Sequence, residues 1–265
     1  MLSETDIAQY KRDGIVVSPG LFTHHEVLAL HAAFDRDAEI PGDHRIIESD
    51  NDQVRALYAS HLRQPEYAAL TRSPRLVGPA RQLLGPEVYL YQFKINAKPG
   101  NGGAGWAWHQ DYVAWRIADG LPAPDLVNVT IFLDDVNESN GPIAFVPGSH
   151  TDGLIRAERS EVRRSGQHLD PDDIALSPDT LDALVERCGV LTPTGQAGTA
   201  VFFHPEIVHG STPNLSPYSR RLAIATYNEV RNTPRPAGEP RPEYLVCRDT
   251  RPLALEADLV IVEAV

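Results

Sequence analysis

Apolar residues recur at helical spacing through much of the first third of the chain, residues 1–86. Ser3 and Thr23 each precede such a segment and are followed three residues later by an acidic residue, a pattern that caps the free amides of a helix N-terminus. Pro65 and Pro74 stand where first-turn prolines belong, so further helices are expected behind them. The first third is therefore predicted to be mostly helical, with one short strand at residues 15–17.

From Val88 the period changes to two, because Val88, Leu90 and Gln92 alternate with tyrosine and phenylalanine side chains. Further strand-like runs, separated by Gly, Pro and Asn, cover residues 106–108, 126–133, 143–146, 199–203 and 222–227. Many short strands without helices between them predict a sandwich or barrel. We therefore expect a single domain over residues 1–265, mainly β with flanking helices, with a β core at residues 87–148 and 196–230.

A charged stretch at residues 149–195 interrupts the strand pattern and contains one predicted helix at residues 178–187. An excursion of this length between strands is usually a lid or a binding loop. We expect residues 149–195 to be an inserted lid.

The composition narrows the choice of partner. The 265 residues include 24 Lys+Arg against 36 Asp+Glu, a formal charge of −12 that disfavours nucleic acid and anionic membranes and favours a small molecule. The two cysteines, Cys188 and Cys247, are too few for a disulfide framework and are typical of a reducing compartment. The N-terminal residues 1–14 have no basic region followed by an apolar run, so a cytoplasmic protein without a membrane span is expected.

Two His-x-Asp tripeptides are candidates for metal binding. His109-Gln-Asp111 ends a short aromatic run, where residues two apart on a strand project from one face and suit two ligands of one metal. The other tripeptide, His168-Leu-Asp170, lies in a polar stretch followed by Pro171, where loop solvation or a helix start explains it.

A third ligand must come from elsewhere in the sheet. His209 follows another apolar strand and is the preferred candidate, while His204 competes with it although Pro205 suggests a turn there. Two imidazoles and one carboxylate on one face leave three octahedral positions open, the arrangement that suits Fe(II) oxygen chemistry. Buried His and Asp side chains that simply pair with backbone groups remain an equal alternative at this point.

Arg220 changes that balance. It opens an apolar strand eleven positions after His209, and an arginine that points into a small barrel is a buried unpaired charge unless it meets a carboxylate. A bidentate acid cosubstrate supplies that carboxylate. Arg221 lies on the opposite face by alternation and is expected at the surface.

Several segments then resemble one family in the same order along the chain. The segments WHQDYVAW, NGPIAFVPGSH and HPEIVHGSTPN, together with Arg220, are similar to the phytanoyl-CoA dioxygenase superfamily of Fe(II)- and 2-oxoglutarate-dependent oxygenases. Within it the chain resembles bacterial hydroxylases of free amino acids, of the ectoine and leucine 5-hydroxylase type. The likeness to the leucine enzymes extends to YASHLRQ, YQFKIN and GEPRPEY, and so covers most of the chain.

This resemblance implies a double-stranded β-helix, a cupin-like jelly roll, and a set of site residues. It implies that His109, Asp111 and His209 bind Fe(II) and that Arg220 binds the distal carboxylate of 2-oxoglutarate. The residues that would assist the cosubstrate or line its site are Ser211, Gln92 and Trp115. A turn hydroxyl, an ordinary strand amide and a core aromatic are the respective alternatives for these three.

The reaction implied by the resemblance is hydroxylation of an unactivated C–H bond by O₂, with release of succinate and CO₂. Asp111 favours hydroxylation over halogenation, since related halogenases carry a small residue at this position. The expected substrate is a small aliphatic amino acid such as leucine or isoleucine, acted on in secondary metabolism by a monomer or small homo-oligomer.

The substrate contacts are the least determined part of the sequence. A free amino acid needs a cation for its carboxylate and an acceptor for its ammonium. Arg241 or Arg116 is a candidate for the first role and Asp170 or Glu243 for the second, while surface or loop contacts are the alternative for each. Candidates for an apolar pocket are Val113, Ile95 and Phe132.

Three other functions remain open from the sequence. A non-catalytic β-helix protein that binds a small ligand would tolerate loss of a metal ligand, and all three are present here. A zinc hydrolase accepts the same ligands but leaves Arg220 without a task. A hydroxylase of a CoA- or carrier-tethered substrate would want a basic patch near its entrance, for which only Arg163-Arg164 stands out.

Overall fold

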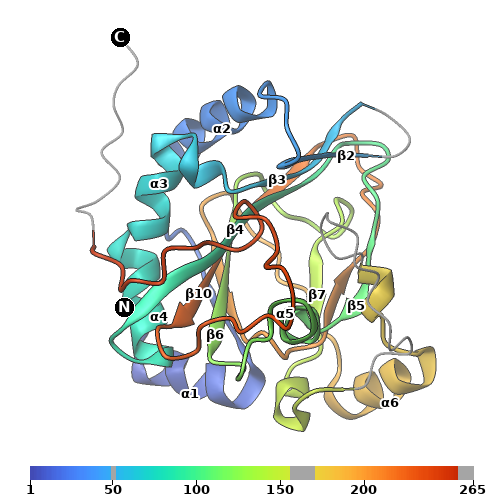
Figure 1. The fold of residues 1–265 in the computed structure, drawn as a ribbon. Helices are drawn as coiled ribbons and strands as arrows, with labels where there is room; N and C mark the ends of the chain where they lie inside the picture. The colour runs from blue at the N-terminus through green and yellow to red at the C-terminus, as the bar shows by residue number, and fades with distance from the viewer. Residues whose placement is uncertain (49–51, 156–170, 256–265) are drawn as a thin grey trace.

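The computed structural model describes residues 1–48, 52–155 and 171–255, and its strands form two antiparallel sheets (Figure 1). The larger sheet has the order β1-β8-β6-β10-β4-β3-β2 and the smaller one the order β5-β9-β7. The strands are β1 (Ile15–Ser18), β2 (Arg45–Ile47), β3 (Val54–Tyr58), β4 (Val88–Lys98), β5 (Trp106–His109), β6 (Leu126–Phe132), β7 (Ile143–Phe145), β8 (Ala200–Phe203), β9 (His209–Ser211) and β10 (Arg220–Glu229). The jelly-roll fold expected from the sequence is confirmed.

The helices lie mostly before β4. They are α1 (Glu4–Asp13), α2 (His24–Ala38), α3 (Pro65–Arg72), α4 (Pro74–Leu84), α5 (Asp111–Asp119) and α6 (Pro178–Cys188), with 3-10 turns η1 (Ser60–Leu62), η2 (Ser149–Asp152) and η3 (Pro171–Ile174). Ser3 and Thr23 form complete capping boxes with Asp6 and Glu26, as the sequence predicts. No helix in the described ranges is both long and apolar enough to cross a bilayer.

Helices α1 to α4 cover the outer face of the larger sheet (Figure 1). Leu30 from α2 and Leu76 from α4 belong to the same buried cluster as Phe93 on β4 and Val129 on β6. The alternation of the strands therefore sends their other side chains inward, toward the smaller sheet. This inner space between the two sheets is where the functional side chains gather.

Two parts of the predicted pattern need correction. The strand expected to carry both His109 and Asp111 ends at His109, because Asp111–Asp119 forms helix α5 with Gln110 as its N-cap residue. Trp115 is therefore a helical side chain. The strands β2, β3 and β9 were not predicted: β2 and β3 lie in the part of the chain expected to be mostly helical, and β9 has only three residues.

The insertion at residues 149–195 can be followed at both ends. Its described C-terminal part contains η3 and α6, and the Leu176 N–H donates to the Trp108 carbonyl at 2.9 Å, which ties the segment to β5. The Arg163-Arg164 pair and the His168-Leu-Asp170 tripeptide lie outside the described residues.

Candidate active site

His109, Asp111 and His209 come together at one end of the space between the sheets. His109 ends β5 and His209 begins β9; the two are register partners, with ring centroids 4.4 Å apart. Nε2 of His109 lies 3.6 Å from Oδ1 of Asp111, and Nε2 of His209 lies 3.7 Å from Oδ2. All three residues offer a ligand atom within 4.8 Å of the others, so they can hold one metal ion.

The route by which Asp111 reaches this position differs from the expected one. The strand ends at His109, and Asp111 is the first residue of α5, where the helix N-terminus favours a negative charge. The competing imidazole, His204, lies outside the group: its Nδ1 accepts the Glu206 backbone N–H at 3.1 Å.

Backbone carbonyls fix the two imidazoles in the orientation that metal binding requires. Nδ1 of His109 lies 2.7 Å from the Ala107 carbonyl and Nδ1 of His209 lies 3.0 Å from the Ile207 carbonyl. A carbonyl can only accept, so each Nδ1 carries the proton and each Nε2 keeps its lone pair for a metal. Burial, together with the nearby His109, lowers the pKa of His209 to about 4, which keeps this ring neutral near pH 7.

The carboxylate of Asp111 is positioned by side chains of the larger sheet. Burial by itself would raise the pKa of Asp111, but the positive charge of Lys94 and the two imidazoles lower it well below its usual range. Oδ2 of Asp111 accepts a hydrogen bond of 2.9 Å from Nδ2 of Asn128, a buried residue of β6. The site therefore presents an ionised carboxylate beside the Nε2 atoms of two imidazoles.

A cavity opens next to the three ligands, and its wall carries polar side chains from β4, β9 and β10. Those from β4 are Gln92, Lys94 and Asn96, which share the inner face by alternation. Ser211 of β9, Arg220 of β10 and Arg241 of the C-terminal segment also belong to the polar part of the wall. Apolar side chains line the rest: Tyr58, Trp106, Ala114, Trp115, Ile143, Ile174, Phe203 and Ile224.

Arg220 has the environment of a side chain built to receive an anion. It is 1% exposed, its Nη2 donates to the Gly141 carbonyl at 2.6 Å, and its Nε has no hydrogen-bond partner in the described structure. Burial lowers its pKa to about 9, an effect that Asp134 opposes. A buried guanidinium with an unused donor fits the carboxylate of an acid cosubstrate.

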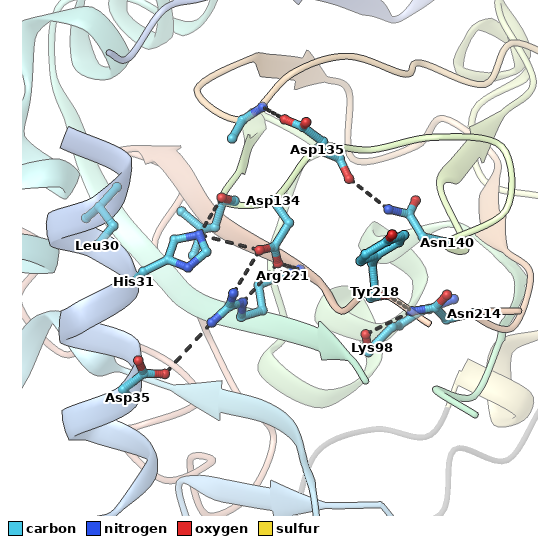
Figure 2. A network of polar contacts seen from close by, with 12 residues as sticks. Leu30, His31, Asp35, Lys98, Asp134, Asp135, Asn140, Asn214, Tyr218 and Arg221 are labelled. Carbon is cyan, nitrogen blue, oxygen red and sulfur yellow. Dashed lines mark hydrogen bonds and ion pairs between the residues drawn. The ribbon is translucent and has the colours of Figure 1, made fainter. Parts of the chain in front are cut away.

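Its neighbour Arg221 is not the surface residue expected from alternation. It is half-buried, and its guanidinium pairs with Asp134 at 2.8 Å while Asp35 lies at 3.8 Å (Figure 2). Asp134 also lies 3.5 Å from Nε2 of His31. Arg221 therefore ties the outer face of β10 to α2.

Other predicted residues are at the cavity. Trp115 lines it and packs edge-on against Tyr91 with ring centroids 5.3 Å apart. Arg241 reaches it from the C-terminal segment, and its Nε and Nη2 pair with the buried carboxylate of Asp119 at 2.7 and 2.5 Å. Nε2 of Gln92 donates to the Leu245 carbonyl at 2.8 Å, which leaves its Oε1 as an acceptor.

The remaining substrate candidates are not brought to the cavity. Arg116 is exposed on α5, and Glu243 is exposed beside a separate groove that Cys247 lines. Asp170 lies outside the described residues. The apolar candidates are also misplaced: Ile95 packs under the helices, Phe132 belongs to a core cluster with Phe145, and Val113 packs behind the cavity wall.

Several residues of the site were missed in the sequence. Lys94 and Asn96 line the cavity, and Asn128 supports the carboxylate ligand. One signal was available for the first two: Gln92, Lys94, Asn96 and Lys98 place polar side chains at every second position of an otherwise apolar strand. That period indicates a strand face that is both buried and polar. Because burying polar groups is unfavourable, such a face indicates a functional site.

Comparison with known proteins identifies the family. The family profile for phytanoyl-CoA dioxygenase (PhyH) matches residues 10–222. The chain belongs to this family. L-proline trans-4-hydroxylase from Streptomyces griseoviridis is 40% identical over 262 residues, which cover 94% of this chain and 95% of that protein. An ectoine dioxygenase from Bordetella parapertussis is 36% identical over 255 residues, 93% of this chain and 83% of that protein.

Solved structures of a similar protein share the fold. EctD from S. alaskensis with 2-oxoglutarate and 5-hydroxyectoine superimposes with a TM-score of 0.85 at 31% identity, covering 98% of this chain and 89% of that one. EctD with bound Fe gives a TM-score of 0.83 over the same shares. The chain is therefore a non-haem Fe(II)- and 2-oxoglutarate-dependent dioxygenase, and its three clustered ligands fit that metal.

Proposed function

We propose that this dioxygenase hydroxylates an unactivated C–H bond of a small free aliphatic amino acid. The observation that carries the proposal is that one cavity, beside three metal ligands, presents two buried or half-buried arginines, Arg220 and Arg241. Arg220 is paired across the sheet with Lys98 at the end of β4, whereas Arg241 is linked through Asp119 to Tyr91 in its middle. Two separated cations suit two carboxylic acids, the cosubstrate and an amino acid.

Arg220 would bind the distal carboxylate of 2-oxoglutarate. Its unpartnered Nε and the hydroxyl of Ser211, which lines the same cavity, are the donors available there. When bound, Fe(II) and 2-oxoglutarate supply the oxidative decarboxylation that activates O₂ for attack on a C–H bond. The chain's own residues bind and orient the two acids and exclude water.

Arg241 would bind the substrate carboxylate. Its pairing with Asp119 uses Nε and Nη2, and the buried carboxylate fixes the plane of the guanidinium, so Nη1 would be the donor to the substrate. Oε1 of Gln92 would accept from the substrate ammonium, because its amide nitrogen is already bonded to the segment that carries Arg241. Gln92 thus fits the substrate better than the cosubstrate.

Trp115, Ile174 and Tyr58 offer an apolar surface for the aliphatic part of the substrate. The relatives that act on L-proline and ectoine make L-proline the first compound to test, with leucine and isoleucine next. A CoA- or carrier-tethered acid is the competing class, and it would leave Arg241 without its carboxylate.

The test is direct. The purified protein is reconstituted anaerobically with Fe(II) and 2-oxoglutarate, exposed to air with each amino acid in turn, and assayed for succinate and for a product heavier by one oxygen atom. We expect both products with a free aliphatic amino acid. Turnover of a thioester together with failure of every free amino acid would contradict the proposal.

We also propose that the enzyme acts in the cytoplasm as a monomer or small homo-oligomer. Its two cysteines are free thiols, which fits a reducing compartment. Light scattering and fractionation of the native host would test these two points.

A further inference from the structure

Lys98 is a buried lysine behind the cavity wall. It ends β4, is 1% exposed, and its Nζ donates to Oγ of Ser211 at 2.7 Å and to the Thr212 carbonyl. Both of these partners are uncharged. Burial and, to a smaller extent, the positive charges of Arg220 and Arg55 together lower the pKa of Lys98 to about 6, while Glu48 opposes the shift.

A second buried cation lies directly opposite. Lys98 and Arg220 are register partners in the β4–β10 pair, so their side chains leave the sheet on one face, about 5 Å apart at Cβ. Like charges at such positions destabilise a sheet, and burial raises the cost. Two buried cations placed so close together are favourable only when an anion binds to both of them, so the pair indicates an anion-binding site.

The residues around Lys98 restrict the conformation of its side chain and its backbone. A Cβ on Gly103 would lie 2.7 Å from Cβ of Lys98, and one on Gly141 would lie 3.0 Å from Cδ and 3.1 Å from Nζ. Nδ2 of Asn214 donates to the Lys98 carbonyl at 3.2 Å and to the Tyr218 carbonyl at 2.7 Å (Figure 2). Glycines thus make room for the stem, and Asn214 fixes the backbone.

The hydrogen bond to Ser211 has a direction. The ammonium form of Lys98, which an anion bound nearby favours, can only donate. In that form Oγ of Ser211 accepts from Lys98 and keeps its own proton for another acceptor. Ser211 lines the cavity with Arg220, so this proton is available to an anion at that end.

We propose that Lys98 is a positioning residue of the cosubstrate site: it turns the Ser211 hydroxyl into a donor toward the Arg220 end of the cavity and adds a second buried positive charge for the distal carboxylate. The inference rests on the proposed binding of that carboxylate by Arg220. On this inference Lys98 lowers the stability of the ligand-free protein and raises its affinity for a dicarboxylate.

The test compares Lys98→Met with Lys11→Met, the same substitution at an exposed lysine. Two ligands are titrated calorimetrically into Co(II)-loaded protein: 2-oxoglutarate, and 2-oxobutyrate, which has the same keto-acid head without a distal carboxylate. Thermal unfolding of the ligand-free protein is followed in parallel.

For Lys98→Met we expect the Kd of 2-oxoglutarate to rise about tenfold or more, the Kd of 2-oxobutyrate to stay unchanged, and the Tm of the ligand-free protein to stay equal or rise. Lys11→Met should change none of these. Equal weakening of both ligands with a lower Tm would mean a merely structural lysine and would overturn the inference. If the wild type itself binds 2-oxoglutarate no better than 2-oxobutyrate, the assignment of Arg220 fails as well.

Ser211→Ala gives a second test that leaves Lys98 in place. If Lys98 acts through this hydroxyl, the double variant should bind 2-oxoglutarate more tightly than the product of the two single effects predicts. Fully additive effects would show that the lysine does not act through Ser211 and would overturn the positioning role.

Discussion

The side-chain amide of Asn128 donates to Oδ2 of Asp111, and Oδ1 of the same amide accepts from Oγ1 of Thr226 at 2.7 Å. Asn128 and Thr226 are register partners on β6 and β10. Because the threonine hydroxyl fixes which end of the amide faces the carboxylate, two strands of the larger sheet orient a ligand that belongs to a helix.

Replacing Asn128 should loosen the metal. We expect Asn128→Leu to lower the affinity for Fe(II) or Co(II) about 10- to 100-fold, since it removes the bond that orients Asp111. Metal titration monitored by Co(II) absorption measures the change. Thr226→Val, which removes only the support of the amide, should have a smaller effect in the same direction; unchanged affinity in Asn128→Leu would contradict the role.

Removing the carboxylate should abolish the reaction. Asp111→Ala leaves two neutral imidazoles and no anionic ligand, so we expect no succinate formation above background. The control is Asp182→Ala on α6, an exposed carboxylate that should not matter. Near-normal turnover in Asp111→Ala would remove Asp111 from the ligand set.

Substitution of Arg241 should affect the binding of the amino acid and leave the binding of 2-oxoglutarate unchanged. Arg241→Ala should raise the KM for the amino acid about 10-fold or more and leave the KM for 2-oxoglutarate unchanged, because only the substrate carboxylate loses its partner. Arg241→Lys keeps the charge but not the planar fork and should lie in between. Arg116→Ala is the matched control, and an equal effect there would count against the assignment.

Asp37 and Arg63 predict how stability depends on pH. Asp37 is 0% exposed, and its carboxylate accepts from Nε and Nη2 of Arg63 at 2.6 and 2.8 Å. Nη2 also donates to the carbonyl of Tyr58, a cavity residue. Asp37→Asn should therefore lower the free energy of unfolding by about 3 kcal/mol near pH 7, since the half-buried guanidinium of Arg63 loses its anionic partner.

The sign of the pH effect follows from the pKa of Asp37. Burial acts to raise it, but the hydrogen bonds and charge of Arg63 outweigh burial and hold it below the usual 3.8. The pair therefore stabilises the fold above about pH 4 and loses its effect as the pH falls through the folded pKa. Denaturant unfolding should show the gap between wild type and Asp37→Asn closing below pH 4; a gap that is constant with pH would contradict the linkage.

The sequence predicted most of the architecture because its local signals agree with the tertiary structure. Ser3, Thr23 and the first-turn prolines begin helices where expected, and the alternation from Val88 became β4, an interior strand of the larger sheet. Asp111 was expected on a strand because the short apolar run around it fits either period, and helix α5 is decided by the packing of Trp115 against Tyr91 and the sheet.

The candidate metal ligands could be predicted because His109, Asp111 and His209 carry their chemistry in their residue types. Asn128 and Lys98 could not, since each is an ordinary polar residue of a strand until the two sheets face each other and bury it. Arg241 and Arg116 looked alike in the sequence, and only the buried Asp119 distinguishes them.

Each of the two imidazole ligands is hydrogen-bonded to a carbonyl only two residues before it in the chain. Their rotamers are thus set by their own strands during folding and do not wait for the ion. The entropy of ordering these side chains is lost before iron arrives, so loading the centre should be a fast, single-step capture with little change in the amide signals of β5 and β9.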